Sequence, residues 1–573
     1  MRQGFLFSII VSIIFCAPAL AYDWSTNPGD GSEANPYQIS TPEQLMSIGS
    51  NADLLDKHFE LVNDIVFDPN NNPQHVFDKA LIASDTDNRT SGFQGTPFSG
   101  CFDGNEYSIL NLKIVNDSYT NSDFLGIFGH LQGSTDTISV RNLFIVNPVF
   151  NIGYEARYVG ALCGMLTDGI VENCHVDALV ISSDWTEARG GGIGGLIAQN
   201  ESGLVRDCSV NCKICGICYL GSAGGLTGRN TGTLENSTVN CTILVGDCQY
   251  GYGAGVGGVT GYNDGNITGC VSKGYIEGTG GVGGVIGRNS GDCSRSFFIG
   301  AVSCHGFATW DIGCGGFVGA NGGYIQECYS ISQIRLRYTV RAAGGFVGYH
   351  DGGAIDRCGS WSKIVCESLC EPRGTGGFLG RSPGGGISNC YSQGEIQTDN
   401  ENMYTLGGFA GDCPYDITKC YTTVGQIHGQ IHPDRDYSIY AFGNFYGFFE
   451  NLKSFYDLQR SNVFNNVFND YDQGSGTSLR TKKMQEKTSF LAAGWDFVGE
   501  DENGTEDIWI MDSEDYPRLA WLPKVSVPEV LNRSLQDVQT KIESAGLTVG
   551  DIRYHYSESV KVVPMRWTES PLN

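Results

Sequence analysis

The sequence predicts an all-β fold, a parallel β-helix or β-solenoid of about ten coils, and three observations support this prediction. The first is the glycine content, because 80 of the 573 residues are glycine, about twice the ordinary share of roughly 7%. The second is a six-residue glycine-containing block that recurs about every thirty positions. The third is that particular residue types keep the same place in each copy of the block. A period of this length indicates a solenoid or a propeller.

The recurring block combines glycine with apolar residues, as in VGGVIG and TGGFLG. A degenerate copy begins at Leu125. Propellers usually have four to eight blades, so these copies would overfill one ring, and the chain carries no Trp-Asp or kelch signature. We therefore expect an open solenoid. The clear copies begin at Val159, Ile193, Ala223, Val256, Val282, Cys314, Ala343, Thr375 and Leu406.

Two columns of buried residues are expected inside the coils. Equivalent residues of successive coils stack ~4.8 Å apart in a parallel sheet, so an apolar column and a column of small side chains would fill a narrow interior. The apolar column, three residues after each block start, is Leu162, Leu196, Leu226, Val259, Val285, Phe317, Phe346, Phe378 and Phe409. The small column, fourteen or fifteen residues after each start, is Cys174, Cys208, Ser237, Cys270, Ser296, Cys328, Cys358, Cys390 and Cys420.

A column of asparagines predicts a polar ladder at a turn. Asparagine tolerates left-handed turn conformations, and its amide can form hydrogen bonds with identical amides in the coils on either side. We therefore expect an amide ladder over five consecutive coils. The column is Asn200, Asn230, Asn263, Asn289 and Asn321.

The repeat resembles the GLUG motif family. GGFLGRSPGGGISNCYSQGEI, residues 376–396, follows the family pattern of two glycines, two hydrophobic residues and glycine, then a turn, then I-x-N-C-Y and a further strand. The resemblance covers about 125–430. It implies an exported surface protein, since members of that family are exported and some are attached to proteases. The motif itself has no assigned chemistry.

The first 21 residues predict a cleaved signal peptide. They run from a charged start at Arg2 through an apolar stretch to Ala19-Leu20-Ala21. No other segment has 18 consecutive apolar residues, so we expect no membrane span. The formal net charge of −27 should repel nucleic acid and anionic lipid. Of the 21 cysteines, Cys16 lies within the signal, and the even remainder would enter a compartment where disulfides persist.

Residues 22–124 are expected to form an N-terminal cap and the first irregular coils. PYQISTPEQLMSIGSN predicts a short strand followed by a helix. Thr41 would be the N-cap, Pro42 the first helical residue, and Gln44 would complete a capping box. A helix here would cover the open end of the solenoid, where sheet edges and apolar core are otherwise exposed.

Residues 431–524 are expected to contain degenerate coils and a C-terminal cap. Their WDF, NG and YPRLAW elements are similar to the tail that closes many such repeat arrays. We expect the aromatic residues of this tail, including Trp495, Trp509 and Trp521, to be core residues rather than a binding site.

Residues 525–573 resemble a single PASTA domain, a small helix-on-sheet module. Ser534 and Asp537 fit a capping box, and Gly546 fits the helix C-cap. The resemblance implies an association with peptidoglycan. The ending at 561–573, KVVPMRWTESPLN, departs from the final strand of that family.

The sequence carries no motif of a metalloprotease, of a serine hydrolase or of a nucleotide-binding enzyme. A polysaccharide lyase remains an alternative, because its acidic and basic residues gather in space rather than in sequence. Arg229, Arg288 and Arg381 occupy equivalent places in their coils, although solvated turn residues are the favoured interpretation.

No catalytic residue and no metal ligand are predicted, and no cofactor is expected apart from weak calcium binding. Residues 68–72 and 501–507 contain acids and amides that could hold calcium, but solvated turns are favoured. The densest cysteine cluster, Cys208 to Cys218, is interpreted as local disulfides or part of a thiol column rather than an iron-sulfur site.

The predicted binding residues are Tyr329, Tyr391 and Tyr421. Each follows a cysteine of the buried column, so alternation along a strand would turn each tyrosine outward. An exposed aromatic strip on a flat sheet can stack on sugar rings, although half-buried positions of ordinary β-propensity are the competing interpretation.

Together these observations predict a non-enzymatic secreted or cell-surface protein for adhesion, glycan or cell-wall binding, or scaffolding. Glycans or peptidoglycan are the expected partners, and nucleic acid is not. A carbohydrate-active enzyme, lyase or hydrolase, with a groove on the solenoid is one alternative. A passive spacer without a ligand is the other.

Overall fold

The computed structural model describes the chain between residues 22 and 522. Within that range it leaves out 88–89, 91, 117–122, 135, 154–156, 184–190, 218–220, 247–254, 306–312, 338–339, 368–372, 399–404, 414–416, 429–437, 441, 445–452 and 462–475. The predicted signal peptide and the PASTA-like segment both lie outside the described residues.

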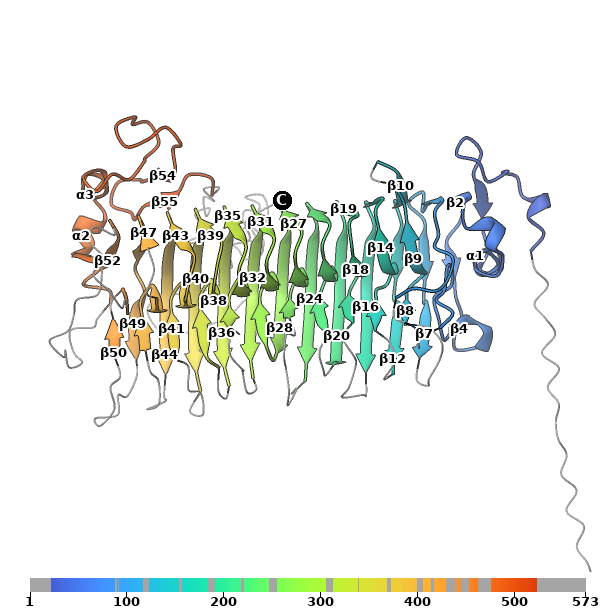
Figure 1. Cartoon of the computed structure of the whole chain (residues 1–573), viewed down its shortest axis with the longest axis horizontal. Coiled ribbons are helices and arrows are strands. Elements are labelled where there is room, and N and C mark those ends of the chain that lie inside the picture. The colour runs from blue at the N-terminus through green and yellow to red at the C-terminus, as the bar shows by residue number, and fades with distance from the viewer. Residues whose placement is uncertain are drawn as a thin grey trace, which may run out of the picture.

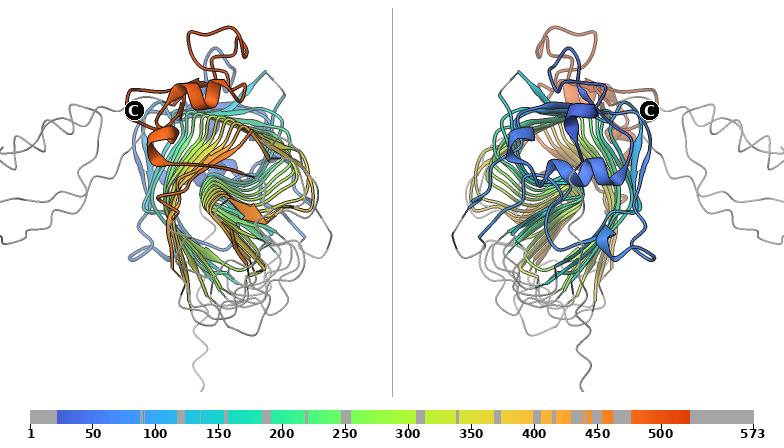
Figure 2. Two further views of the ribbon diagram at one scale, coloured as in Figure 1. Left: turned by 90° about the vertical axis from the view of Figure 1, so that its left-hand side faces the viewer. Right: turned by 90° about the vertical axis from the view of Figure 1, so that its right-hand side faces the viewer.

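The repeats form a parallel β-solenoid, which confirms the predicted fold class (Figure 1). Each regular coil contributes one strand to each of four sheets, named here A, B, C and D in the order in which the chain enters them. In end view the strands of successive coils lie over one another (Figure 2). The predicted number of about ten coils is close to the 11 strands that sheets A and B each contain among the described residues.

Sheets A and B hold the two halves of the glycine-containing block. Sheet A consists of β8 (Phe124–Leu125), β13 (Tyr158–Val159), β17 (Gly192–Gly194), β21 (Ser222–Gly224), β25 (Gly255–Gly257), β29 (Gly281–Gly283), β33 (Cys314–Gly315), β37 (Ala342–Gly344), β41 (Gly374–Gly376), β45 (Thr405–Gly407) and β50 (Ser438–Tyr440). Sheet B consists of β9 (Phe128–Gln132), β14 (Cys163–Thr167), β18 (Ile197–Asn200), β22 (Thr227–Asn230), β26 (Thr260–Asn263), β30 (Ile286–Asn289), β34 (Val318–Asn321), β38 (Val347–His350), β42 (Leu379–Arg381), β46 (Ala410–Asp412) and β51 (Gly443–Asn444).

Sheets C and D begin earlier in the chain and contain 13 and 18 strands. Sheet C consists of β1 (Tyr37–Ile39), β2 (His58–Leu61), β5 (Cys101–Asp103), β10 (Ile138–Arg141), β15 (Ile170–Glu172), β19 (Leu204–Arg206), β23 (Thr233–Glu235), β27 (Asn266–Thr268), β31 (Asp292–Ser294), β35 (Tyr324–Gln326), β39 (Ala354–Asp356), β43 (Gly386–Ser388) and β47 (Ile417–Thr418). Sheet D consists of β3 (Ile65–Val66), β4 (Val76–Phe77), β6 (Ser108–Leu110), β7 (Lys113–Asn116), β11 (Phe144–Val146), β12 (Val149–Ile152), β16 (His175–Ser183), β20 (Ser209–Ile217), β24 (Thr238–Val245), β28 (Val271–Gly278), β32 (Phe297–Cys304), β36 (Tyr329–Leu336), β40 (Gly359–Cys366), β44 (Tyr391–Thr398), β48 (Tyr421–Thr422), β49 (Gly425–His428), β52 (Phe455–Asp457) and β53 (Thr477–Leu479).

The glycines of the block are needed because the backbones of sheets A and B touch. A Cβ atom added to Gly283 in sheet A would lie 2.1 Å from the carbonyl oxygen of Ile286 in sheet B. A Cβ added to Gly287 in sheet B would lie 2.3 Å from the backbone nitrogen of Val256. Both distances are far inside van der Waals contact, and the atoms approached are backbone atoms that cannot rotate away. The recurring glycines therefore set the close packing of the two sheets.

Both predicted columns lie in the core. Every residue of the apolar column is fully buried. The rings of Phe317, Phe346, Phe378 and Phe409 are stacked in parallel with centroids 4.7 to 4.9 Å apart. The stacking distance matches the spacing of neighbouring strands.

The asparagine column forms the predicted ladder. The side-chain amide of Asn230 donates to the Oδ1 atom of Asn263 at 2.8 Å, and Asn263 donates to Asn289 at 2.8 Å. The ladder begins at Asn200 and ends where Asn321 lies 3.1 Å from the Nδ1 atom of His350. All five asparagines are buried, so each bond satisfies polar groups that have no access to water.

The left-handed turn that we expected at these asparagines lies elsewhere in the coil. The left-handed residue immediately precedes the cysteine or serine column, as at Asn173, Asp207 and Arg357, whose φ angles are 51°, 54° and 52°. This position varies in residue type from coil to coil. The backbone geometry of the corner, and not one residue type, is the repeated feature.

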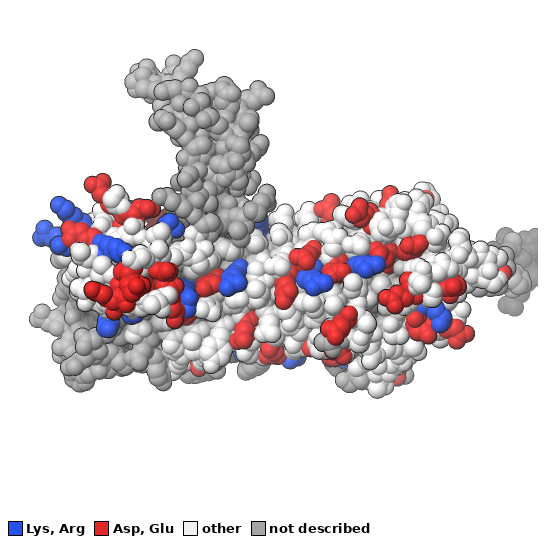
Figure 3. Space-filling view, turned by 90° about the horizontal axis from the view of Figure 1, so that it is seen from above, with Lys and Arg blue, Asp and Glu red and all other residues white. Residues whose placement is uncertain are grey.

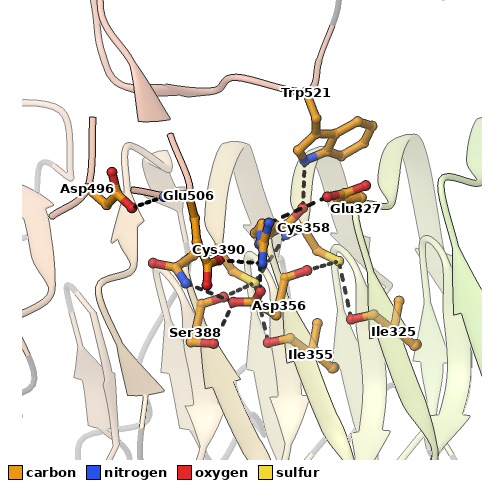
Figure 4. A network of polar contacts seen from close by, with 12 residues as sticks. Ile325, Glu327, Ile355, Asp356, Cys358, Ser388, Cys390, Asp496, Glu506 and Trp521 are labelled. Atoms are coloured by element: carbon orange, nitrogen blue, oxygen red, sulfur yellow. Dashed lines mark hydrogen bonds and ion pairs between the residues drawn. The ribbon is translucent and has the colours of Figure 1, made fainter. Parts of the chain in front are cut away.

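The cysteine column consists of buried thiols that form hydrogen bonds with the backbone. The thiol of Cys390 lies 3.0 Å from the carbonyl oxygen of Ser388 and accepts from the backbone N–H of Cys358 at 3.4 Å (Figure 4). Ser237 makes equivalent contacts through its hydroxyl, accepting from the N–H of Cys208 and donating to the carbonyl oxygen of Glu235. The cysteines of the column are free thiols, and they are small core residues, as expected.

Charged side chains on the outer side of sheet C pair between neighbouring coils. Acidic and basic residues alternate along this side of the molecule (Figure 3). Arg141 pairs with Asp103 at 2.7 Å, and Arg206 pairs with Glu172 at 2.5 Å. Each pair joins one coil to the next, but exposed pairs of this kind contribute little stability individually.

The N-terminal cap contains the predicted helix, α1 (Pro42–Ile48). Thr41 accepts from the backbone N–H of Gln44 at 3.3 Å, and Gln44 Oε1 accepts from the N–H of Thr41 at 3.1 Å. Leu45 and Ile48 are fully buried, and the helix lies across the end of the solenoid (Figure 2). Three short 3-10 helices complete this region: η1 (Trp24–Thr26), η2 (Ala52–Leu54) and η3 (Pro73–His75).

The C-terminal segment, residues 477–522, packs against the outer side of sheet D. After β53 it contains α2 (Thr481–Met484), α3 (Lys487–Leu491) and the antiparallel pair β54 (Trp509–Ile510) and β55 (Arg518–Leu519). Trp495 and Trp509 are fully buried in a cluster with Tyr421 and Phe455 of the solenoid, as the sequence predicts for core aromatics. The segment thus covers the side of the last coils as well as their end (Figure 1).

Candidate binding face

The three predicted tyrosines share one column on the outward side of sheet D, as alternation predicts. Tyr329 is half-buried, but Tyr391 and Tyr421 are buried beneath the C-terminal segment. The rings of Tyr391 and Tyr421 are stacked 5.3 Å apart, and the Tyr421 hydroxyl donates to the carbonyl oxygen of Pro517 at 2.5 Å. The prediction of an exposed aromatic strip is therefore wrong for Tyr391 and Tyr421, because residues 477–522 cover the surface that a ligand would need.

Contacts at the corner between sheets C and D extend this covered area toward earlier coils. Trp521 donates from its indole nitrogen to the carbonyl oxygen of Arg357 at 2.9 Å, and Arg357 pairs with Glu506 at 2.7 Å (Figure 4). The Trp521 ring lies 5.7 Å from the ring of Phe297, at the start of β32. The first outward column of sheet D is thus occupied from β32 to β52.

The next outward column of sheet D is open to solvent and carries the largest exposed aromatic residue of that sheet. Trp361 in β40 is 49% exposed. It pairs with Ile331 in β36, which in turn pairs with Ile299 in β32, and both isoleucines are half-buried. A tryptophan ring with aliphatic neighbours on a flat sheet forms an apolar platform that other parts of the described chain leave uncovered.

Polar residues follow this platform along the same strands and on the same face. Gln333 lies opposite Lys363, and Arg335 lies opposite Val365. Ile334, between Gln333 and Arg335, and Leu336, after Arg335, are buried in the core, so the alternation along β36 is regular. We call this set, together with the platform, the outer D face: Ile299, Ile331, Trp361, Gln333, Lys363 and Arg335.

An ion-pair network borders the outer D face where the strands of sheet D end. Glu277 in β28 lies 3.7 Å from His305 and 3.9 Å from Arg337, and the Tyr275 hydroxyl also donates to it. Arg337 in addition lies 3.5 Å from Glu367. The network joins four consecutive coils and brings an acid, a histidine, a tyrosine and an arginine together on one surface.

The three arginines considered for a lyase share one column of sheet B but do not meet. Tyr262 separates Arg229 from Arg288 in the register, and Arg381 lies further along. Arg229 pairs with Asp264 at 3.1 Å, and Arg381 pairs with Asp412 at 3.1 Å. This arrangement does not gather the arginines around one point.

The acidic turns considered for calcium are engaged in local hydrogen bonds. The carboxylate of Asp68 accepts from Asn71, and that of Asp507 accepts from the backbone N–H of Gly499. Among the residues that the structure describes, no group of three His, Cys, Asp or Glu side chains is placed to hold a metal ion. Weak calcium binding stays a prediction.

Sequence reasoning did not single out Trp361 and Arg335, although the signal for their direction was present. Arg335 lies six residues after Tyr329, which was expected to point outward, and alternate residues of a strand point to the same side, so Arg335 should point outward as well. Trp361 lies three residues after the column residue Cys358, which was expected to point inward, so the same alternation turns Trp361 outward. Their exposure depends on how much of sheet D the C-terminal segment covers, and the local sequence pattern does not predict the extent of that cover.

Comparisons with known proteins do not assign this chain to a family. No protein-family model matches the chain, and no curated protein matches it. One solved structure with some similarity is a "putative immunoglobulin A1 protease" from Bacteroides ovatus, with 15% identity, 86% of this chain and 94% of that chain covered, and a TM-score of 0.25. So low a TM-score carries no conclusion about this chain. The fold assignment rests on strand register, and the resemblances to the GLUG and PASTA families stay predictions.

The part of the chain between residues 22 and 522 that the structure describes contains no helix long and apolar enough to cross a membrane.

Proposed function

We propose that this chain is an exported, non-enzymatic attachment protein that binds glycan on the outer D face of its solenoid. The observation that carries the proposal is Trp361, which is 49% exposed on a flat sheet between half-buried neighbours. Sugar rings present C–H groups that pack on the face of an indole ring, and exposed aromatic residues with polar neighbours are typical of binding surfaces.

The polar residues beside Trp361 support this proposal. Gln333 offers amide donors and an acceptor, and Lys363 offers an ammonium group that lies within 2.5 Å of Glu395. The hydroxyl groups of a sugar both donate and accept hydrogen bonds, so they need acceptors and donors on the protein. The parallel sheet holds these side chains in fixed register, so little ordering is needed when a ligand binds.

The export signal and the acidic charge support a place outside the cytoplasm. The first 21 residues fit a cleaved signal peptide, and a formal charge of −27 keeps an elongated protein soluble and away from nucleic acid. We place the protein at the cell surface or in the secreted fraction. Peptidoglycan, through residues 525–573, is a second proposed partner.

The test measures binding of the full mature chain to a glycan array and to sedimenting peptidoglycan. Replacing Trp361 with Ala should weaken glycan binding by about tenfold or more, as expected for an aromatic residue at the centre of an interface. Tyr324→Ala is the matched control, because Tyr324 is 64% exposed but lies on sheet C. The proposal fails if wild-type protein binds no glycan, or if both variants bind equally well.

A carbohydrate-active enzyme is the second candidate, and the network around Glu277 favours it. A histidine, a carboxylate, a phenol and an arginine on one surface could move a proton and neutralise an acidic sugar. Release of unsaturated or shortened products from acidic polysaccharides, abolished by Glu277→Gln, would establish this activity. Intact polysaccharide after prolonged incubation would exclude it for the polymers tested.

A further inference from the structure

We infer that the glycan recognised by the outer D face is acidic, and that Arg335 holds its anionic group. This inference rests on the proposed function, because it names the ligand class of the same surface.

Arg335 differs from the cations nearest to it, Arg337 and Lys363, in having no carboxylate partner among the described residues. Arg337 lies near Glu277 and Glu367, and Lys363 pairs with Glu395. Arg335 is exposed, and its two register partners in the sheet, Ser303 and Val365, carry no charge. Its guanidinium group therefore keeps its donors available for a ligand.

The chemistry of an unpaired guanidinium favours an oxyanion. Its planar array of N–H donors matches a carboxylate or a sulfate group, and such hydrogen bonds are about twice as strong as neutral ones. Arg337, two residues further along the chain, lies near Glu277 and Glu367, so its charge is already compensated. Arg335 is therefore the cation that can accept an anionic group.

The distance between Trp361 and Arg335 sets the size of the ligand. Trp361 lies opposite Ile331, and Arg335 is four residues beyond Ile331 on β36. Four residues span roughly 13 Å along a strand, and neighbouring strands are ~4.8 Å apart. A short acidic oligosaccharide can cover that distance with one ring on Trp361 and one acid group at Arg335.

The same surface does not suit a nucleic acid. Every nucleotide carries a phosphate, and binding needs many cations along the strand. Glu277, Glu367 and Glu395 border the outer D face, and the chain as a whole carries a formal charge of −27. A polymer with spaced acid groups can place one of them at Arg335 and keep the others away from the glutamates.

The experiment measures binding of the full mature chain to matched pairs of oligosaccharides. Each pair consists of an acidic oligomer, based on galacturonate, guluronate, mannuronate, glucuronate or a sulfated sugar, and its neutral counterpart with reduced carboxyl groups or no sulfate. Wild-type protein should bind at least one acidic member about tenfold more tightly than its neutral counterpart. Arg335→Gln should remove that difference and lower the salt dependence of binding.

Arg295→Gln is the matched control, because Arg295 is an exposed arginine that lies next to sheet C and pairs with Glu327. This variant removes the same charge and should keep the wild-type preference. The inference is overturned if no acidic oligomer binds better than its neutral counterpart, if Arg335→Gln and Arg295→Gln behave alike, or if single-stranded DNA binds as tightly as the best oligosaccharide.

The two variants of the face separate this inference from the proposed function. If Trp361→Ala weakens binding of acidic and neutral glycans alike while Arg335→Gln changes nothing, the glycan face stands and the acidic class is wrong. If Arg335→Gln removes acidic binding while Trp361→Ala has no effect, the anion site stands and stacking on Trp361 is wrong. If neither changes binding, both proposals fail.

Discussion

The hydroxyl group of Tyr421 donates a hydrogen bond to the carbonyl oxygen of Pro517, 96 positions further along the chain. Tyr421 belongs to the solenoid and Pro517 to the C-terminal segment, so this bond joins the two parts of the molecule. The stacked ring of Tyr516, 6.3 Å from that of Tyr421, adds an aromatic contact at the same place.

Replacing Tyr421 should loosen the C-terminal segment. Tyr421→Phe removes one buried hydrogen bond and should cost about 1 kcal/mol, whereas Tyr421→Ala removes a fully buried aromatic ring and should cost roughly 3–5 kcal/mol. Limited proteolysis should then cut residues 477–522 faster in the Ala variant. Tyr324→Ala, at an exposed site, should change cleavage little. Equal cleavage of the wild-type and Tyr421→Ala proteins would contradict the packing described here.

Breaking the amide ladder at its centre should destabilise the solenoid. Asn263→Ala leaves the donor of Asn230 and the acceptor of Asn289 without their partners in a buried site, and each such group costs roughly 1–3 kcal/mol. Denaturant unfolding should show a lower midpoint. Asn240→Ala removes the same amide from an exposed position of β24 and should leave the midpoint unchanged. A ladder without energetic importance would give both variants the same midpoint.

Adding one methyl group between sheets A and B should be far more damaging than adding it at the surface. Gly283→Ala places a Cβ atom 2.1 Å from a carbonyl oxygen, so the two sheets must separate, and overpacking of this kind typically costs roughly 1–3 kcal/mol or more. Gly386→Ala meets no atom within 4 Å and serves as the control. Thermal unfolding of the two variants compares them directly. A normal melting temperature for Gly283→Ala would show that the sheets are not in backbone contact.

Acidification should destabilise the region around His130. Burial lowers the pKa of His130 to about 4, while an unfolded histidine has a pKa of roughly 6.5. Between these values the unfolded chain binds the proton more readily, so this contribution to stability falls as the pH drops from about 6.5 to about 4, by at most about 3 kcal/mol.

The measurement compares unfolding at pH 7 and pH 4.5 for the wild-type protein and for His130→Gln. The variant should lose less stability over this interval, because it has no imidazole to protonate. A histidine with the same pKa in the folded and unfolded chain would give both proteins the same loss, and that result would contradict the prediction.

The sequence predicts the interior of the solenoid well because the interior repeats. Neighbouring coils place similar residue types at the same depth. The columns that contain Phe346, Asn263 and Cys390 are therefore recognisable as repeated positions in the sequence, and their members stack on one another in the structure. The left-handed corner is different. Asn173, Asp207 and Arg357 share a backbone conformation but no residue type, so composition gave no signal for it.

The surface could be predicted only in part. Alternation along β44 and β48 predicts that Tyr391 and Tyr421 point away from the core, and they do. Their burial depends on residues 477–522 returning to the side of the solenoid, which is a contact between distant parts of the chain. The C-terminal segment does not reach Trp361, which stays exposed. The local sequence pattern therefore cannot predict which part of sheet D is covered and which part is open to solvent.

The backbone contact between sheets A and B also has a consequence for the length of the molecule. Gly283 and Gly287 fit against the neighbouring coil in the same way as their equivalents elsewhere, since Gly315 and Gly319 meet the same kinds of backbone atoms at similar distances. These coils therefore present matching backbone surfaces in sheets A and B. Removing or duplicating one of them as a unit should bring together coils whose backbones still fit in these two sheets.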